Sequence, residues 1–333
     1  MGVKLMDCTL RDGGNVVGDG FDAVIEDMVI DGLTACHVPY IEFGNSKGIG
    51  AYDLGYKNCL SDDEYLDIAA KYKDRGSLLG MFLNAKRFKD ENVAKGKDWG
   101  IGFFRVGAEA GDAEISLPVV KAVKKHGVTA FYSLMKAYLL TPEQLAEEAK
   151  KLEDAGLDEI TIMDSAGTML PEQVARYTTC LKEAVKIPVA FHCHNNLILS
   201  AANAVEAYKN GADILDCGLM GMARSAGNLA TEACVAIMQR YGEMQDIDLY
   251  GMLDFIDGRL MPAMKERGYH NPVKPLDLTL GISGAHSSFV KTFRKVAEEN
   301  QVNLFQLITE VSKINQKNPS EDLMREVAAK LKA

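Results

Sequence analysis

The stretch Glu159-Ile160-Thr161-Ile162-Met163-Asp164 is short and apolar, and a segment with helical amphipathic spacing follows it from Pro171 to Val185. A second apolar run, from Val189 to His194, comes next. A buried strand, a helix and another strand in this order predict a parallel β-α-β unit.

The same unit recurs along the chain, because short apolar runs alternate with helical segments. The eight runs are Lys4 to Leu10, Ala35 to Gly44, Ser77 to Leu83, Ile101 to Val106, Ala130 to Met135, Glu159 to Asp164, Val189 to His194 and Ile214 to Leu219. Eight repeats are typical of a parallel (β/α)8 barrel, so we expect an α/β fold of the TIM-barrel type. One helix start is explicit: Thr141, Pro142 and Gln144 form a capping box with proline at the first helical position.

The alternation of strands and helices stops after about Tyr241. From there on only helical segments follow, separated by prolines: Leu249 to Arg267, His286 to Asn300, Leu304 to Ile314 and Ser320 to Leu331. Helices without strands between them indicate a separate helical domain. We therefore expect a catalytic barrel over residues 1–245 and a helical C-terminal domain over residues 246–333.

The composition narrows the class of protein. The 333 residues carry a net charge of -10, with acidic and basic residues interspersed, which argues against a nucleic-acid-binding surface. The N-terminal residues lack a long apolar segment, so we expect no membrane association and a cytoplasmic location. The seven cysteines are odd in number and scattered, as reduced thiols would be.

A histidine pair ends the seventh apolar run. Side chains alternate faces along a strand, so His192 and His194 point the same way and can bind one metal ion. Asp12, which follows the first run, is the natural third ligand, because active sites of such barrels gather at the carboxyl ends of the strands. One carboxylate and two imidazoles leave coordination positions open, which favours a divalent Lewis acid, Mn²⁺ or Mg²⁺ before Zn²⁺ or Co²⁺.

Other polar residues at the predicted strand ends are candidates for substrate binding. Arg11, next to Asp12, offers a guanidinium fork to a carboxylate or to a developing enolate oxygen. Lys136 is either a solvated charge or a group that binds an anionic part of the substrate. Asp164 either caps the following segment or orients the substrate. The remaining candidates are Glu42 and Ser165.

Two motifs together resemble a known superfamily. The segments 7–13 (Asp-Cys-Thr-Leu-Arg-Asp-Gly) and 192–196 (His-Cys-His-Asn-Asn) are similar to the paired signature of the TIM-barrel metallolyases, which include isopropylmalate synthases and hydroxymethylglutaryl-CoA lyases. Within that superfamily the chain most resembles the 4-hydroxy-2-oxovalerate aldolases over nearly its whole length. The stretches 40–44, 221–229 and 280–289 carry this closer resemblance.

The resemblance implies a function. Asp12, His192 and His194 would bind a divalent metal, usually manganese, and Asn228 matches a metal ligand of the related lyases. Arg11 would hold the enolate of pyruvate. The implied reaction is reversible aldol cleavage of a 4-hydroxy-2-oxoacid to pyruvate and an aldehyde through a metal-bound enolate, which makes a small 2-oxoacid the expected substrate.

Two positions depart from the aldolase pattern. The histidine that acts as base on the 4-hydroxyl in these aldolases is Asn15 here, and the assisting tyrosine is His286. An asparagine cannot exchange protons at neutral pH, whereas an imidazole can. His286 is therefore a candidate base, and the alternative is that it only packs or caps at the start of the following helix.

The resemblance also implies a partner and leaves alternatives open. The aldolases generally associate with an acylating aldehyde dehydrogenase through their helical domain, and a homo-oligomeric contact through the same domain is the other option. A Claisen-type enzyme that condenses an acyl-CoA with a 2-oxoacid is the first alternative function. A catalytically silent barrel that serves as an assembly subunit is the second.

Overall fold

The computed structural model describes residues 2–269, 275, 276, 279, 283, 285, 289–315 and 319–332. The chain divides into two compact units, Met1–Ile247 and Asp248–Ala333. Strands are confined, among the described residues, to the first unit, and the second is helical.

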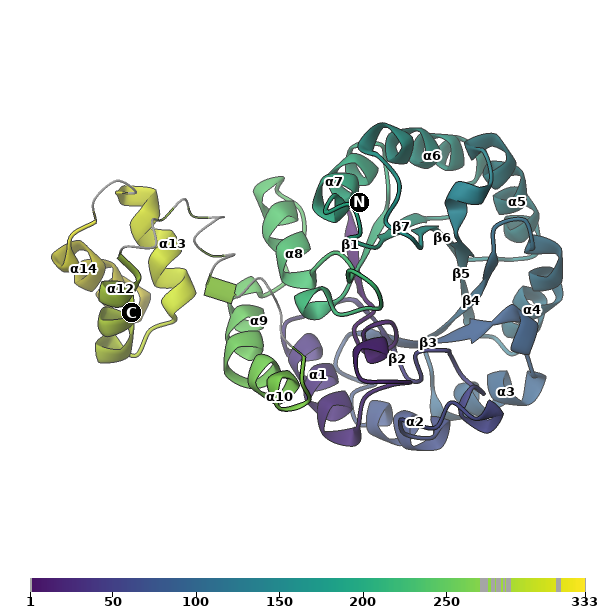
Figure 1. The fold of residues 1–333 in the computed structure, drawn as a ribbon, viewed down its shortest axis with the longest axis horizontal. Coiled ribbons are helices and arrows are strands. Elements are labelled where there is room, and N and C mark those ends of the chain that lie inside the picture. Colours follow the sequence, from purple (N-terminus) through teal and green to yellow (C-terminus); the bar gives the residue numbers. More distant parts are fainter. Residues whose placement is uncertain are drawn as a thin grey trace. The chain divides into compact units, whose positions relative to one another are not determined.

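The first unit is a closed barrel of parallel strands in the order of the sequence (Figure 1). The predicted TIM barrel is therefore confirmed. The strands are β1 (Lys4–Asp7), β2 (Tyr40–Phe43), β3 (Leu78–Asn84), β4 (Phe103–Glu109), β5 (Thr129–Met135), β6 (Glu159–Asp164), β7 (Val189–Cys193) and β8 (Ile214–Cys217). Strand β1 pairs with both β2 and β8, which closes the ring.

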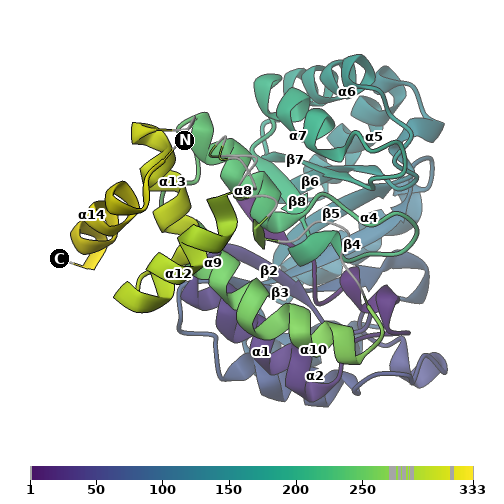
Figure 2. The ribbon, with the colours of Figure 1, turned by 60° about the vertical axis from the view of Figure 1, so that its left-hand side comes forward.

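Helices surround the barrel and cover the outer face of the strands (Figures 1 and 2). They are α1 (Ala23–Ala35), α2 (Asp62–Ala70), α3 (Asp90–Trp99), α4 (Ala113–Lys125), α5 (Pro142–Asp154), α6 (Pro171–Ala184), α7 (Ser200–Lys209) and α8 (Thr231–Arg240). The predicted capping box of α5 is present, since the Thr141 side chain accepts from the Gln144 amide and the Gln144 side chain accepts from the Thr141 amide.

Two predicted strands were too long, and local backbone geometry explains both. Strand β1 ends at Asp7 because the carbonyl of Cys8 accepts from the amides of Arg11, Asp12 and Gly13, which folds the chain into a tight turn. Strand β2 begins only at Tyr40, because α1 continues to Ala35. His37, with φ of 62°, then reverses the chain before the strand.

The second unit contains α9 (Leu249–Phe255), a π-helical turn (Ile256–Leu260), α10 (Met261–Glu266), α12 (Val290–Asn300), α13 (Leu304–Ile314) and α14 (Glu321–Lys332). Helices α12, α13 and α14 share an apolar core that includes Phe293, Ile308 and Met324. The elements α9, the π-helical turn and α10 follow one another without a break, and Pro262 lies in the first turn of α10. His286 lies outside the described residues.

Aromatic rings fill the amino-terminal end of the barrel interior. The rings of Phe103 and Phe131 stack with their centroids 4.7 Å apart, and Tyr40 meets both edge-on.

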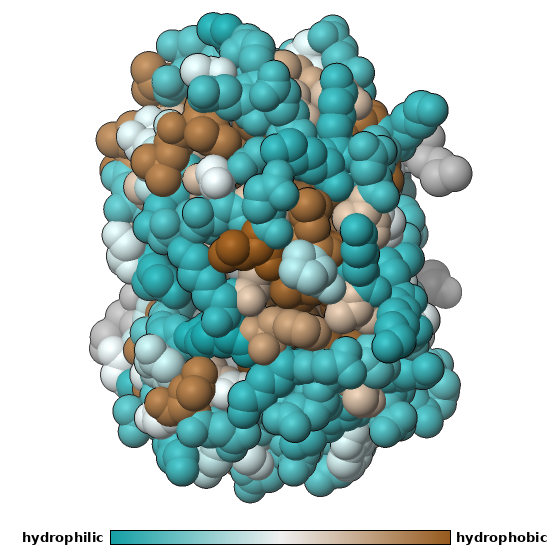
Figure 3. Space-filling model, turned by 90° about the vertical axis from the view of Figure 1, so that its right-hand side faces the viewer, coloured by the Kyte–Doolittle hydropathy of each residue, from teal (hydrophilic) through white to brown (hydrophobic). Residues whose placement is uncertain are grey.

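Outside the barrel, the face that carries α4 and α5 is mostly hydrophilic, with hydrophobic residues gathered near its centre (Figure 3). Among the described residues, no helix combines the length and apolar character needed to cross a membrane.

The stacked pair offers a test of the barrel core. Replacing Phe103, which is fully buried, with alanine should lower the free energy of unfolding by about 3 to 5 kcal/mol, because it opens a cavity in a close-packed layer. Urea unfolding followed by circular dichroism would measure the loss. Val24→Ala is the control, since the Val24 side chain is 61% exposed and should change stability by less than about 0.5 kcal/mol.

Candidate metal centre

Asp12, His192 and His194 converge at the carboxyl end of the barrel. One potential ligand atom from each lies within 4.8 Å of the others. The Nε2 atoms of His192 and His194 are 3.7 Å and 3.9 Å from Oδ2 of Asp12. All three side chains are buried. Strand β7 and the β1 turn therefore bring together the three side chains that the sequence grouped.

Asn228 lies beside this group, because its backbone forms an antiparallel bridge with His194. Its Nδ2 donates to Oδ2 of Asp12 at 2.9 Å, and its Oδ1 is buried without a hydrogen-bond partner among the described residues. Gly227 permits this approach, since its φ is 84° and a Cβ there would lie 2.3 Å from the carbonyl oxygen of Gly221.

The charges of the group suit a cation. Burial alone would raise the pKa of Asp12, but Arg11 and the two histidines outweigh burial and hold that pKa well below its usual value. Burial, reinforced by His192, lowers the pKa of His194 to about 4. His194 is therefore neutral at pH 7, with a lone pair free for a ligand bond.

The donor set fits a divalent metal ion. Two imidazole nitrogens face one carboxylate oxygen, and the unpaired Oδ1 of Asn228 is a further oxygen donor beside them. A buried polar atom without a partner is costly, which is consistent with a group that a ligand completes.

Arg11 is held rigidly beside the same group. Its Nε donates to Oε2 of Glu42 at 2.7 Å, and its Nη1 lies 3.0 Å from Oδ1 of Asp12. Its Nη2 is buried and has no hydrogen-bond partner among the described residues. The guanidinium packs over the ring of Phe82, 5.3 Å from the ring centroid. Nη2 of Arg11 is therefore a fixed donor that stays available for an oxygen atom of a ligand.

A chain of buried ion pairs supports Arg11 from below. Glu42 also accepts from Arg105, at 2.9 Å from Nε and 2.6 Å from Nη2, and Nη1 of Arg105 pairs with Asp216. Asp216 in turn lies 3.3 Å from Nδ1 of His192. This orientation leaves Nε2 of His192 facing Asp12.

Sequence reasoning missed Arg105 and Asp216. Both stand inside apolar runs, and a charge in a buried strand requires a partner, so this signal was available. The register places His192 opposite Asp216 on neighbouring strands. The side chains of Arg105 and Asp216 extend into the barrel below the candidate centre.

The other predicted substrate-binding residues have protein partners. Glu42 is fully buried and uses both oxygens on arginines. Both oxygens of Asp164 accept from backbone amides, those of Thr168 and Met169, which is a loop-capping geometry. Nζ of Lys136 lies 2.5 Å from Glu109, and the Ser165 hydroxyl accepts from the Lys136 amide at 2.9 Å.

Asn15 connects the centre to a lysine that sequence reasoning also missed. Its Nδ2 donates to the backbone oxygen of Asp12 at 2.8 Å and to Oδ1 of the same residue at 3.3 Å. Its Oδ1 accepts from Nζ of Lys47 at 2.6 Å. The half-buried Lys47 comes from the loop after β2.

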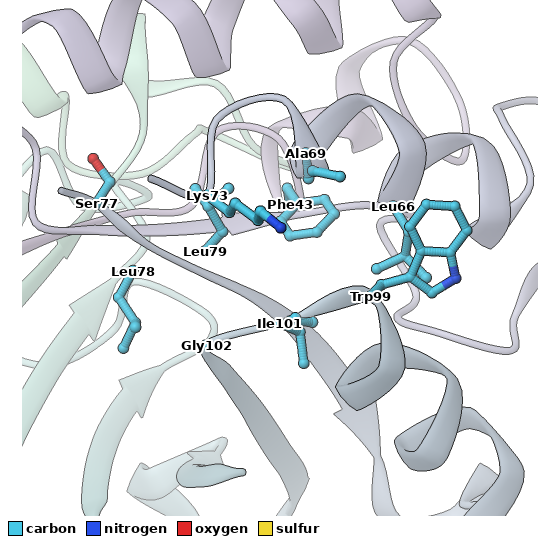
Figure 4. A pocket seen from close by; sticks show the side chains of 12 residues that line it. Phe43, Leu66, Ala69, Lys73, Ser77, Leu78, Leu79, Trp99, Ile101 and Gly102 are labelled. Atoms are coloured by element: carbon cyan, nitrogen blue, oxygen red, sulfur yellow. The ribbon is translucent and has the colours of Figure 1, made fainter. Parts of the chain in front are cut away.

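A hollow of about 60 Å³ lies apart from this centre, outside the barrel wall between α2 and α3 (Figure 4). Its lining is mainly apolar, and Lys73 is its one charged lining residue among those described. Among the described lining residues there is no cluster of titratable groups, and the one buried polar side-chain atom without a partner is the Ser77 hydroxyl. The hollow therefore carries no chemistry that competes with the candidate centre.

Comparisons with known proteins agree with the fold. A family model described as HMGL-like matches residues 112–257. Hydroxymethylglutaryl-CoA lyase from Pseudomonas aeruginosa has a similar structure, with a TM-score of 0.69 at 17% identity over 85% of this chain and 98% of that one. These two matches place the barrel in the general class of HMGL-like folds.

Full-length relatives define the family more narrowly. The chain is 33% identical to the 4-hydroxy-2-oxovalerate aldolase of Moorella thermoacetica, over 99% of this chain and 96% of that protein. It is also 33% identical to the aldolase of the same name from Spirochaeta aurantia, again over 99% and 96%. The chain belongs to the 4-hydroxy-2-oxovalerate aldolase family and is a carbon-carbon lyase.

The loop that carries Asn228 depends on a buried carboxyl group, and this gives a pH-dependent prediction. Oε2 of Glu232 accepts from the Met220 amide at 3.1 Å, and burial raises the pKa of Glu232 from 4.5 to about 7. The unfolded chain therefore releases this proton at lower pH than the folded chain. The associated stability is complete below pH 4.5 and is lost as the pH rises to 7.

Glu232→Gln removes this titration and keeps an oxygen acceptor for Met220. Relative to the variant, the wild type should lose about 3 kcal/mol of unfolding free energy between roughly pH 4.5 and 7.5. Urea unfolding across this range would measure the difference. Glu147→Gln, at an exposed position, is the control, and a wild-type curve parallel to that of Glu232→Gln would contradict the assignment.

Proposed function

We propose that this protein is a divalent-metal-dependent aldolase that cleaves, or forms, a 4-hydroxy-2-oxoacid, with pyruvate and an aldehyde as the other side of the reaction. The observation that carries the proposal is the unpaired, buried Nη2 of Arg11 directly beside Asp12 and the two histidines. A fixed cationic donor next to a metal-ligand set suits a substrate that develops negative charge on oxygen. The names of the full-length relatives support the same reaction.

Asp12, His192 and His194 would hold the metal, with Asn228 as a further or weaker ligand. Mn²⁺ is the ion we propose, and the mixed oxygen and imidazole donors also admit Mg²⁺, Co²⁺ or Zn²⁺. When bound, such an ion supplies Lewis-acid polarisation of the 2-oxoacid.

Arg11 would bind and orient the 2-oxoacid part of the substrate. In the cleavage direction the 4-hydroxyl gives its proton to a base, the bond between C3 and C4 breaks as the aldehyde C=O forms, and the electron pair remains on the pyruvate part as an enolate. Protonation of this enolate at C3 gives pyruvate. Nη2 of Arg11 would donate to the oxygen that gains this charge. Glu42 keeps the guanidinium in place, because it accepts from Nε and leaves Nη2 available.

The proposal also includes residues near the site of proton transfer, a partner protein and a substrate class. Asn15 positions Asp12 and Lys47 through its carboxamide, and His286 stays a candidate base for the 4-hydroxyl. An acylating aldehyde dehydrogenase, or a second copy of this chain, stays a predicted partner of the helical unit. The small 2-oxoacid is the substrate class.

The function can be tested directly on the purified full-length protein. With Mn²⁺ supplied, cleavage of 4-hydroxy-2-oxoacids should release pyruvate. A coupled lactate dehydrogenase assay measures this pyruvate as NADH consumption. Asp12→Asn should abolish stoichiometric Mn²⁺ binding in calorimetry together with turnover, because it removes the anionic ligand. Acetyl-CoA-dependent thiol release without pyruvate formation would instead support the Claisen-type reaction, and wild-type protein that binds no metal would contradict the proposal.

Arg11→Lys separates metal binding from transition-state stabilisation. Lysine keeps the charge but cannot contact Glu42, Asp12 and a substrate oxygen at once. We expect kcat to fall about 100-fold or more, in the range found for the loss of one preorganised donor, with the Kd for Mn²⁺ changed far less. Arg75→Lys, an exposed pair with Asp31, is the matched control. Equal losses in kcat and metal affinity would show that Arg11 acts only through Asp12.

A further inference from the structure

Lys47 extends from the loop after β2 to the edge of the candidate centre. Its ammonium group is 2.6 Å from Oδ1 of Asn15, and Asn15 in turn contacts Asp12. Lys47 is thus separated from the metal-ligand group by one side chain, on the side of the site that Asn15 occupies.

The loop holds Lys47 in a fixed position. The Lys47 amide donates to Oδ1 of Asn45 at 2.9 Å, and Nδ2 of Asn45 donates to the Tyr56 backbone oxygen at 3.0 Å. Nη2 of Arg87 donates to the Lys47 backbone oxygen. Gly48, with φ of 94°, closes the loop where a Cβ would lie 2.6 Å from the backbone oxygen of Phe82. These contacts hold the backbone at Lys47, and the hydrogen bond to Asn15 holds its ammonium group.

Arg224 lies on the loop after β8, at the same rim of the barrel. The same loop carries Asn228, which donates to Oδ2 of Asp12 and forms a backbone bridge with His194. Arg224 is exposed and lies in the segment between Gly221 and Asn228, so it stands near the opening of the site. Within the described part of the chain, neither Lys47 nor Arg224 forms an ion pair with a carboxylate.

This pair of cations is electrostatically unsatisfied. Burial is the first cause that lowers the pKa of Lys47, and repulsion from Arg224 is the second. Asp19 and Asp12 attract the ammonium and Arg11 repels it, and the net effect still lowers the pKa. An anion between Lys47 and Arg224 would remove the repulsion and gain charge-assisted hydrogen bonds.

We infer that Lys47 and Arg224 form a subsite for an anionic group, a carboxylate or a phosphate, on the part of the substrate that becomes the aldehyde. The inference rests on the proposed aldolase function, in which Arg11 and the metal-ligand group take the 2-oxoacid part. Asn15 separates the two regions, so the subsite lies beyond the bond that breaks. The aldehyde is therefore an anionic one rather than a simple alkyl aldehyde.

The test uses matched pairs of aldehydes in the condensation direction, with pyruvate and Mn²⁺. Glyceraldehyde 3-phosphate is compared with glyceraldehyde, and succinic semialdehyde with butanal. The wild type should favour the charged member of at least one pair about tenfold or more in kcat/KM, and the preferred pair tells phosphate from carboxylate. Lys47→Met and Arg224→Met should each reduce that ratio about tenfold, mainly through KM of the charged aldehyde.

Controls keep the result interpretable. Lys47→Arg should restore much of the preference, and Lys57→Met should leave it intact, because Lys57 is exposed and packs on the ring of Tyr52. A wild type without preference for either charged aldehyde, or a preference that survives both methionine variants, would overturn the subsite.

A second measurement does not depend on turnover. Inorganic phosphate and acetate are each titrated into the wild type and into Lys47→Met in calorimetry. The wild type should bind at least one of the two anions more tightly than the variant does. If no aldehyde of either kind reacts, the proposed aldolase function fails, while this titration still decides on the subsite. Equal binding of both anions by the two proteins would refute it.

Discussion

The candidate site depends on a line of buried charges that crosses the barrel interior. It runs from Asp12 through Arg11, Glu42 and Arg105 to Asp216, which lies 3.3 Å from Nδ1 of His192. Arg105 is fully buried, and removing one partner of such a pair leaves an uncompensated charge that costs about 3 to 5 kcal/mol. Every member is therefore held by its neighbours. The consequence for the site is that Arg11 and His192 are fixed from below, before any ligand arrives.

The barrel could be predicted from the sequence, whereas the pairing of these buried charges could not. The barrel follows from eight short-range periodic patterns, and each pattern is local. Asp12, His192 and His194 could be grouped because all three lie at or just after the carboxyl ends of strands, and these ends meet at one rim. Arg105 and Asp216 could not be paired from the sequence, because their contact depends on the register across the barrel. A charge inside an apolar run announces that a partner exists and does not say which one it is.

Asn15 shows a second limit of sequence reasoning. Taken alone, an asparagine at this position removes a proton-transfer group. In the structure its carboxamide joins Asp12 to Lys47, which comes from another loop. Loop conformations have no period that a sequence pattern can reveal, and the glycines at 44 and 48 mark a turn without giving its direction. The contact between Asn15 and Lys47 could therefore not be predicted from the sequence.

The distribution of charge gives these contacts a common purpose. A chain with a net charge of -10 repels a small anion at long range, so an anionic substrate needs local positive charge to bind. The positive groups at this rim do not act in the same way. Arg11 is neutralised in part by Glu42 and Asp12 and keeps one directed donor, whereas Lys47 and Arg224 keep net charge. A directed donor orients the reacting oxygen, and net charge attracts a distant anionic group. The site therefore separates the chemistry of the bond that breaks from the recognition of the part that leaves.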